Sequence, residues 1–216
     1  MEQQTFKLVS VTGINRMYKF LHVYLMQIYL PFTIGLPMFC ASIGVLSPKT
    51  QEILVGVIYN PILNEMTTAI KNQGSFLNGE QIQLDNTGSF SPSLSQSVIN
   101  IGFPVVQQST LIVSSRAITA LCTEVRGLRM IACASQVMAW VAQGKLQAYV
   151  SWDLNAWDIA AGMLIVKEAG GDIYDMKNEK ENAGVEARDM VVTSSGGKLM
   201  RDELLNVLKK NDCLSY

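Results

Sequence analysis

Two aspartates in the second half of the sequence could bind a metal ion or a phosphorylated ligand. Asp153 and Asp158 are separated by a short polar and aromatic stretch that contains Asn155. Metal-assisted phosphoryl chemistry needs several carboxylates, because these oxygen ligands hold Mg²⁺ and orient a water molecule. If Asp153 follows a strand and Asp158 lies in the first turn of a helix, both side chains can face one pocket. Helix capping is the competing explanation, since acids in first turns are ordinary capping residues.

A helix is predicted to begin near Ala156 and to position Asp158. The residues that follow are small or aliphatic and end in Glu-Ala-Gly-Gly at 168–171, which is typical of a helix with a glycine stop. In the first turn, free backbone N–H groups and the positive end of the helix dipole favour a carboxylate or a phosphate. The small residues at 160–162 would let this helix pack closely against its neighbours.

A second candidate site is a run of small residues, Ala132, Cys133, Ala134 and Ser135, between a predicted strand and a predicted helix. Such a turn exposes backbone N–H groups to an anion or to ligand hydroxyls. A nucleophilic thiol at Cys133 is the alternative. It is disfavoured, because no histidine lies near it in the sequence to activate the thiol.

The overall composition indicates a globular protein that does not bind nucleic acid. Of 216 residues, 49% are apolar and 16% are charged, which is enough to bury a large core in one domain or in two packed lobes. The net charge is −1, and the scattered Lys and Arg residues form no basic cluster. The four cysteines have no metal-ligand spacing and predict reduced thiols in a cytoplasmic protein. The single histidine, His22, excludes most histidine-based mechanisms.

One uncharged stretch raises the question of a membrane. The run from Phe20 to Met38 is long enough to cross a bilayer as a helix. Pro31, Gly35 and Pro37 interrupt it, which favours a buried segment followed by a core strand. Membrane contact is therefore not expected, and the mixed polar residues before this run predict no cleavable signal peptide.

Turn signals and hydrophobic periodicity divide the chain into an atypical segment at 1–34, a β-rich lobe at 35–95 and an α/β lobe at 96–216. The first lobe is predicted to be an antiparallel meander with a turn at 73–79 and strands at 39–46, 53–59, 65–70 and 81–84. A loop at 85–95 marks the boundary. In the second lobe, strands are predicted at 97–102, 127–131, 147–151, 172–174 and 190–194, helices at 110–123, 135–143 and 198–210, and a charged surface loop at 178–188.

The segment from Trp157 to Gly171 resembles the second signature of the inositol monophosphatase family. Three further stretches, at 35–44, 56–65 and 74–79, agree with the family in order, so the resemblance runs from about residue 35 to about residue 208. It implies an α/β (α+β layered) fold, the αβαβα sandwich shared with fructose-1,6-bisphosphatase, incomplete at the N-terminus. It also implies a Mg²⁺-dependent, lithium-sensitive phosphatase of small inositol or sugar phosphates, usually dimeric, in which water attacks a metal-polarised phosphate.

The resemblance assigns roles to particular residues. Asp158 matches an aspartate that binds a metal and meets the substrate, and the turn at 132–134 matches a Gly-Ser/Thr-Ala turn whose backbone contacts the inositol ring. Ala132 replaces that glycine and narrows the approach. Ser151 stands where inositol-selective members carry a glutamate, for which Asp153 could partly substitute. The resemblance therefore implies that Asp158 is a metal ligand and that the substrate-binding residues are Asp158, Ala132, Cys133, Ala134, Ser151 and Asp153.

The sequence departs from the family upstream of residue 35. Counting back from there, the two aspartates of the first metal-binding signature should fall at Tyr24 and Gln27. No Asp or Glu occurs between Glu2 and Glu52, so no shift of the alignment recovers them. The upstream Gly-Glu-Glu segment and N-terminal helices of the family are also absent. One aspartate cannot hold two hard cations beside a phosphate with useful affinity.

The sequence therefore predicts a phosphomonoester hydrolase of this family, acting on inositol 1-phosphate or a related sugar phosphate, with impaired activity. Because the break is abrupt, an altered coding sequence upstream is a better explanation than gradual loss. The alternatives are a non-catalytic binding or dimerising remnant, a membrane-anchored variant, and a nucleotide bisphosphatase or fructose-bisphosphatase-like member.

Overall fold

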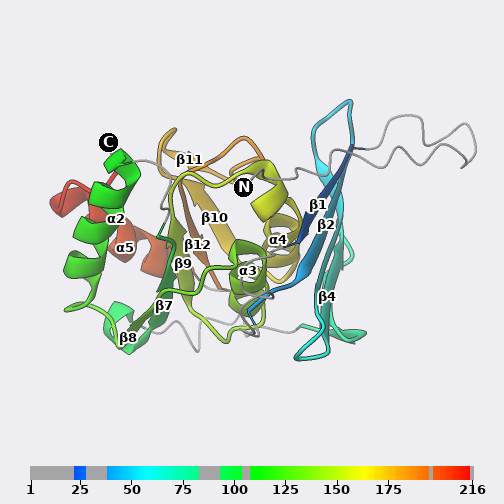
Figure 1. The fold of residues 1–216 in the computed structure, drawn as a ribbon, viewed down its shortest axis with the longest axis horizontal. Coiled ribbons are helices and arrows are strands. Elements are labelled where there is room, and N and C mark those ends of the chain that lie inside the picture. Colours follow the sequence, from blue (N-terminus) through cyan, green and yellow to red (C-terminus); the bar gives the residue numbers. More distant parts are fainter. Residues whose placement is uncertain (1–21, 28–37, 83–92, 104–107, 195–196, 215–216) are drawn as a thin grey trace, which may run out of the picture.

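The computed structural model describes residues 22–27, 38–82, 93–103, 108–194 and 197–214 (Figure 1). The described strands form two six-stranded sheets, and the first is antiparallel throughout. Its strands follow the order of the chain and pair with their sequence neighbours. They are β1 (His22–Gln27), β2 (Ala41–Leu46), β3 (Ile53–Asn60), β4 (Glu65–Ile70), β5 (Ser75–Leu77) and β6 (Glu80–Gln81).

The second sheet has the order β11-β10-β12-β9-β7-β8. β7 is parallel to β8 and β9, whereas the other pairs are antiparallel. Its strands are β7 (Val98–Ile101), β8 (Gly127–Arg129), β9 (Ala148–Ser151), β10 (Asp172–Asp175), β11 (Lys180–Glu181) and β12 (Met190–Thr193). The helices are α2 (Gln108–Leu121), α3 (Ala134–Ala142), α4 (Ala156–Glu168) and α5 (Lys198–Lys210), with a short 3-10 helix at Leu94–Gln96.

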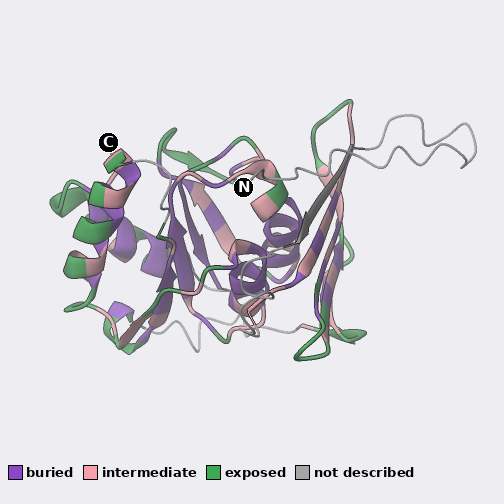
Figure 2. Ribbon diagram, in the orientation of Figure 1, coloured by how far each residue is buried: buried purple, intermediate pink, exposed green. Residues whose placement is uncertain are grey.

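The elements stack in four layers, helices and sheets in turn. Figure 1 shows α2 and α5 on one face of the second sheet, α3 and α4 between the two sheets, and the first sheet outermost. Among the described residues, no helix covers the outer face of the first sheet. That face carries partly exposed apolar side chains, including Met66 and Ile70, each 46% exposed, and it is mostly pink and green in Figure 2. The described part of the chain is thus an αβαβ arrangement.

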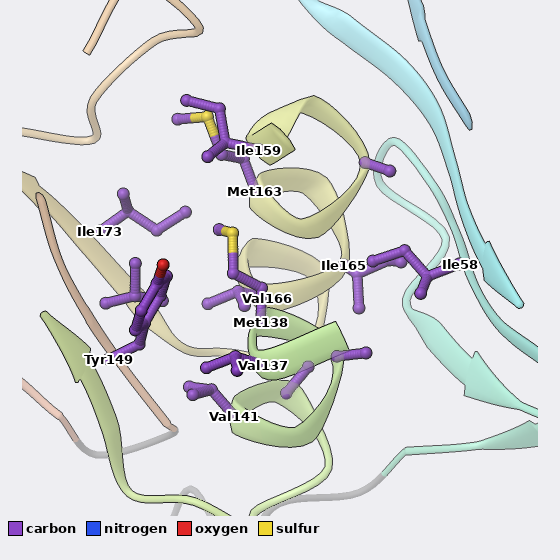
Figure 3. Packing of buried hydrophobic residues seen from close by; sticks show 14 of the residues in the cluster. Ile58, Val137, Met138, Val141, Tyr149, Ile159, Met163, Ile165, Val166 and Ile173 are labelled. Carbon is purple, nitrogen blue, oxygen red and sulfur yellow. The ribbon is translucent and has the colours of Figure 1, made fainter. Parts of the chain in front are cut away.

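Helix α4 lies at the centre of the core because it is apolar on every side. All residues from Ile159 to Val166 are buried, which is the pattern of a helix covered on all faces. Figure 3 shows Ile159 and Met163 directed towards Ile173 of the second sheet, whereas Ile165 meets Ile58 of the first. Both sheets are therefore held by one helix.

Glycines in the first sheet bring α4 unusually close to the strands. A Cβ added to Gly44 of β2 would lie 2.8 Å from the Ala160 Cβ, and one added to Gly56 of β3 would lie 2.7 Å from the Ala161 carbonyl oxygen. The sequence prediction that residues 160–162 allow close packing is confirmed. Gly162 faces α3, where an added Cβ would lie 2.7 Å from the Met138 Cβ.

The end of α4 is fixed to the first sheet by its last residue. The two carboxylate oxygens of Glu168 accept hydrogen bonds from the backbone N–H groups of Asn72, at 2.8 Å, and Gly74, at 2.9 Å. Both of those residues have positive φ. The turn between β4 and β5 is therefore held against the helix, and Gly170, with φ of +84°, follows the helix as the predicted stop.

The predicted elements are confirmed with small shifts of their ends, apart from two regions. The turn predicted at 73–79 contains strand β5, and the predicted strand at 81–84 is replaced by β6, which begins and ends earlier. The loop predicted at 178–188 contains β11 and buries Ala183 and Ala187. Both errors arose because strands of two or three residues are too short to show a periodicity.

The uncharged run at 20–38 is described only in part. Residues 22–27 form strand β1, paired with β2 from His22 opposite Leu46 to Gln27 opposite Ala41. This contradicts a membrane helix through those residues. No helix in the described ranges is long and apolar enough to cross a membrane. The remainder of the run, and most of the predicted loop at 85–95, lie outside the described residues.

Candidate active site

The first turns of α3 and α4 lie beside each other and are joined by a hydrogen bond. The Ser135 hydroxyl, buried at the start of α3, donates to the backbone carbonyl of Asp158 at 2.7 Å. In α4, Asn155 is the N-cap residue, and its backbone N–H donates to Oδ2 of Asp158 at 2.9 Å. Asp158 is thus the N3 residue of a capping box, so capping accounts for an acid in this first turn. The hydrogen bond from Asn155 uses one carboxylate oxygen of Asp158 and sets the orientation of that carboxylate.

A cavity of about 240 Å³ opens beside these two turns. All six residues assigned to ligand binding from the sequence line this cavity, although they come from three separate segments. Sequence reasoning missed the other lining residues, which belong to the ends of β7 and β8 and to the neighbourhood of β9. The complete lining is Ile101, Gly102, Phe103, Met130, Ile131, Ala132, Cys133, Ala134, Tyr149, Ser151, Trp152, Asp153, Leu154 and Asp158.

The Asp158 carboxyl has a raised pKa. Burial is the main cause, because a carboxylate loses hydration when it is moved out of water. The hydrogen bonds from Asn155 and the positive charge of Arg188 oppose this effect without cancelling it. The ionised form of Asp158 is therefore less stable in the folded protein than in water, and a bound cation or hydroxyl donor would relieve this penalty.

Asp158→Asn is expected to raise the melting temperature of the ligand-free protein at pH 7. An acid whose pKa is higher in the folded state than in the unfolded state stabilises the fold at low pH, and that contribution is lost as pH rises above the unfolded pKa. Asparagine can still accept the Asn155 hydrogen bond without a charge. The gain should be roughly 0.5–1 kcal/mol, as is common when a strained site residue is replaced. Calorimetry at pH 7 and pH 4 should show that the difference in melting temperature between the variant and wild type is smaller at pH 4. A variant that melts below wild type at pH 7 would contradict this account.

Asp153 lies on the same cavity wall but already has a cationic partner. Its Oδ1 accepts a hydrogen bond from Nε of Arg188 at 3.2 Å and forms an ion pair with the same guanidinium. Its backbone N–H donates to Oδ1 of Asp189 at 3.0 Å, and its φ of +53° lies in the left-handed region. Arg188 comes from the end of the predicted surface loop, and no spacing in the sequence links it to Asp153.

Ser151 forms the inner wall of the cavity, where it is 2% exposed. It is hydrogen-bonded to Tyr149, whose hydroxyl has a pKa raised mainly by burial. Opposite it, a Cβ on Gly102 would lie 2.1 Å from the Ser151 hydroxyl oxygen. Only glycine fits at position 102, because the new atom would overlap Ser151. The cavity wall is therefore closely packed at Ser151, the position at which the resemblance to inositol-selective members predicts a glutamate.

The residues present do not fit a site for two Mg²⁺ ions. Mg²⁺ needs near-octahedral oxygen coordination, usually with more than one carboxylate. In the described ranges, no group of three or more His, Cys, Asp or Glu side chains could hold a metal ion. At the cavity itself, Asp158 has one oxygen occupied by Asn155 and Asp153 is paired with Arg188.

The two positions at which the family resemblance expects aspartates both lie in strand β1. In β1, Tyr24 pairs with Gly44 and Gln27 pairs with Ala41. The residue before Ala41 is Cys40, whose Sγ lies 3.5 Å from Sγ of Cys133, a residue of the cavity lining. The end of β1 therefore approaches the cavity from the side of the first sheet.

Comparisons with known proteins identify the family of this chain. A sequence profile described as the Inositol monophosphatase family matches residues 30–211. An inositol-1-monophosphatase from Mesorhizobium japonicum is 32% identical over 182 residues, and a fructose-1,6-bisphosphatase/inositol-1-monophosphatase from Thermotoga maritima is 30% identical over 179. Each alignment covers 83% of this chain and 63% of the relative, so the chain spans less than two thirds of the length of these relatives.

The fold is shared with solved structures. The extragenic suppressor protein SuhB from Bartonella henselae superposes with a TM-score of 0.77 at 28% identity, covering 88% of this chain and 70% of that one. The Thermotoga maritima inositol monophosphatase superposes with a TM-score of 0.72 at 30% identity, covering 85% and 65%. The expected fold class is confirmed. Profile, relatives and structures together show that this chain belongs to the inositol monophosphatase family.

Proposed function

We propose that the cavity binds a small phosphorylated inositol or sugar, and that this chain hydrolyses the phosphate ester weakly or not at all. The observation that carries the proposal is the cavity itself. It gathers the turn at 132–134, Ser151, Asp153 and Asp158 on one surface, although nothing in the sequence spacing requires this. Homodimer formation and a cytoplasmic location are further expectations that follow from the family resemblance and the reduced cysteines.

Two helix N-termini supply the affinity for an anion. The cavity lining includes Cys133 and Ala134 at the start of α3, and Leu154 and Asp158 at the start of α4. Unpaired N–H groups and the positive dipole ends at such termini favour a phosphate group. The Asp158 carboxylate can then accept a hydrogen bond from a sugar or inositol hydroxyl.

Weak hydrolysis follows from the acids that are missing. When bound in this family, Mg²⁺ polarises the phosphate and activates the attacking water. At the two positions where the family resemblance expects acids of the metal site, this chain has Tyr24 and Gln27. The residues that remain can bind and orient a phosphate ester, and they offer no activated nucleophile. The second candidate, a non-catalytic binding protein, differs from the first only in the complete absence of turnover.

The identity of residue 151 bears on the ligand. A serine hydroxyl is neutral and short, whereas a glutamate would accept two hydroxyl hydrogen bonds from an inositol ring. The relative from Thermotoga maritima is named for fructose-1,6-bisphosphate as well as inositol phosphate. Ser151 favours a sugar phosphate of that class as the ligand over inositol 1-phosphate.

Calorimetric titration of the purified chain with fructose 1,6-bisphosphate and with inositol 1-phosphate tests the proposal. Binding of at least one ester is expected, with the sugar bisphosphate bound more tightly. Asp158→Asn should weaken it about tenfold, because a hydrogen bond to a charged group contributes roughly 1.5 kcal/mol or more. Glu80→Gln, an exposed acid on β6, is the matched control and should leave the affinity unchanged. Equal affinity in wild type and Asp158→Asn would exclude this cavity as the binding site.

A further inference from the structure

We propose that Cys40 and Cys133 are a redox-active thiol pair that a hydroperoxide converts into a disulfide. The bond would join the segment before β2 to the turn at the N-terminus of α3. The inference rests on the geometry of the two thiols and does not depend on the proposed phosphatase function.

The two thiols are far apart in the sequence and adjacent in space. Their sulfur atoms lie 3.5 Å apart, in hydrogen-bonding contact, although 93 positions separate the residues. Both side chains are buried, at 2% and 1% exposed. A disulfide bond is about 2.05 Å long, so the sulfur atoms need to approach by only about 1.5 Å. Small side-chain rotations can supply that movement.

Cys133 is the thiol that reacts first. It is the N-cap residue of α3, where the helix dipole favours a thiolate, and it lines the cavity that a small oxidant can enter. A hydrogen bond from the Cys40 thiol lowers the pKa of Cys133, and burial opposes the change. The same hydrogen bond, together with burial, raises the pKa of Cys40. Cys40 does not line the cavity and therefore acts as the resolving thiol.

The reaction balances with hydrogen peroxide as the oxidant. The Cys133 thiolate attacks one peroxide oxygen, so that an S–O bond forms as the O–O bond breaks, giving a sulfenic acid and hydroxide. The hydroxide takes up the proton that the thiol released and becomes the first water. The Cys40 sulfur then attacks the Cys133 sulfur, the S–O bond breaks, and the hydroxyl group leaves with a proton as water. Overall, two thiols and one hydrogen peroxide give one disulfide and two waters. A small dithiol reverses the step by exchange.

The bond would connect two layers of the fold at the wall of the candidate site. Cys40 leads into the first sheet, whereas Cys133 belongs to the turn between β8 and α3. Closing so long a loop restricts the unfolded chain, so oxidation should raise the melting temperature by roughly 5–10 °C. The turn at 132–134 would also lose its freedom to move relative to β2.

Peptide mapping of the full chain tests the proposal. Cys122 is exposed and is the site at which copies would crosslink, so the Cys122→Ser variant is used beside wild type. Each protein is reduced, exposed to a few equivalents of hydrogen peroxide, denatured, alkylated and digested. The expected product is one crosslinked peptide pair containing Cys40 and Cys133, lighter by two hydrogens than the reduced pair, in both proteins. Treatment with dithiothreitol should remove the link and the gain in melting temperature.

Single variants separate the two roles. In Cys40→Ser, dimedone should trap a sulfenic acid at Cys133, whereas in Cys133→Ser the thiol at position 40 should stay reduced. Cys213→Ser, another buried thiol, should leave the crosslink intact. The wild-type map decides the question even if a variant fails to fold. The proposal is overturned if Cys40 and Cys133 are both alkylated after a dose that fully oxidises Cys122, or if either forms its disulfide with a different cysteine.

Discussion

The purified chain is expected to release phosphate from inositol 1-phosphate at least about a thousand times more slowly than the Thermotoga maritima relative in millimolar Mg²⁺. Removing one residue that hydrogen-bonds to a metal ligand already lowers metal affinity or activity about 10–100-fold. Here carboxylates that should bind the metal directly are themselves missing, so a larger loss of activity is expected. Malachite-green detection of phosphate measures the rate, with fructose 1,6-bisphosphate as the second substrate. Melting of the same sample shows that the protein is folded. Turnover within tenfold of the relative would refute the idea that Tyr24 and Gln27 deprive the site of its metal.

A gain of function provides the control for this prediction. The double variant Tyr24→Asp/Gln27→Asp returns carboxylates to the two positions of β1 at which the family resemblance expects them. Its Mg²⁺-dependent rate should exceed that of wild type by at least about tenfold, since each carboxylate adds an oxygen ligand for the metal. Adding Asp158→Asn to the double variant should abolish the gain. A rate that rises without Mg²⁺, or that survives the third substitution, would point to a contaminating phosphatase.

Gly56→Ala is expected to lower the free energy of unfolding by about 3 kcal/mol, at the upper end of overpacking effects. The new Cβ would lie 2.7 Å from the Ala161 carbonyl oxygen and 3.2 Å from its Cα, and neither atom can move without shifting α4. Urea unfolding followed by circular dichroism measures the change. Gly127→Ala is the matched control, because this strand glycine faces only the Arg129 guanidinium, at 3.3 Å, which can swing away. Its stability should change by less than about 0.5 kcal/mol.

Gly44 allows a sharper version of the same test. An added Cβ there meets the Ala160 Cβ at 2.8 Å, so Ala160→Gly removes the obstructing atom. The loss in free energy of unfolding of the double variant Gly44→Ala/Ala160→Gly should be smaller, by at least about 1 kcal/mol, than the sum of the losses of the two single variants. Ala161→Gly should give no such rescue of Gly56→Ala, because the obstruction there is backbone. Equal rescue at both positions would contradict the geometry of this contact.

The sequence predicted best those features that depend only on residues close together in the chain. The run from Ala156 to Glu168 gave the helix, its acidic first turn and its glycine stop, because capping and burial depend on neighbours within a few residues. The same local pattern also allowed the role of Asp158 in capping this helix to be predicted. Short strands such as β5 and β11 were not predicted, since two or three residues carry no usable period.

The sequence alone determined the family, the central helix and the lack of any acid between Glu2 and Glu52, because each of these is a property of residue order. Tertiary structure decided which distant residues meet. Gly102 abuts Ser151 because β7 pairs with β9, and Arg188 reaches Asp153 because β12 pairs with β9. Cys40 contacts Cys133 because the first sheet stacks against the layer that contains α3. Periodicity reports which side of an element is buried, and it does not report what covers that side. The cavity wall at Gly102 and Ser151 is therefore a product of strand pairing, and the thiol pair is a product of packing between layers.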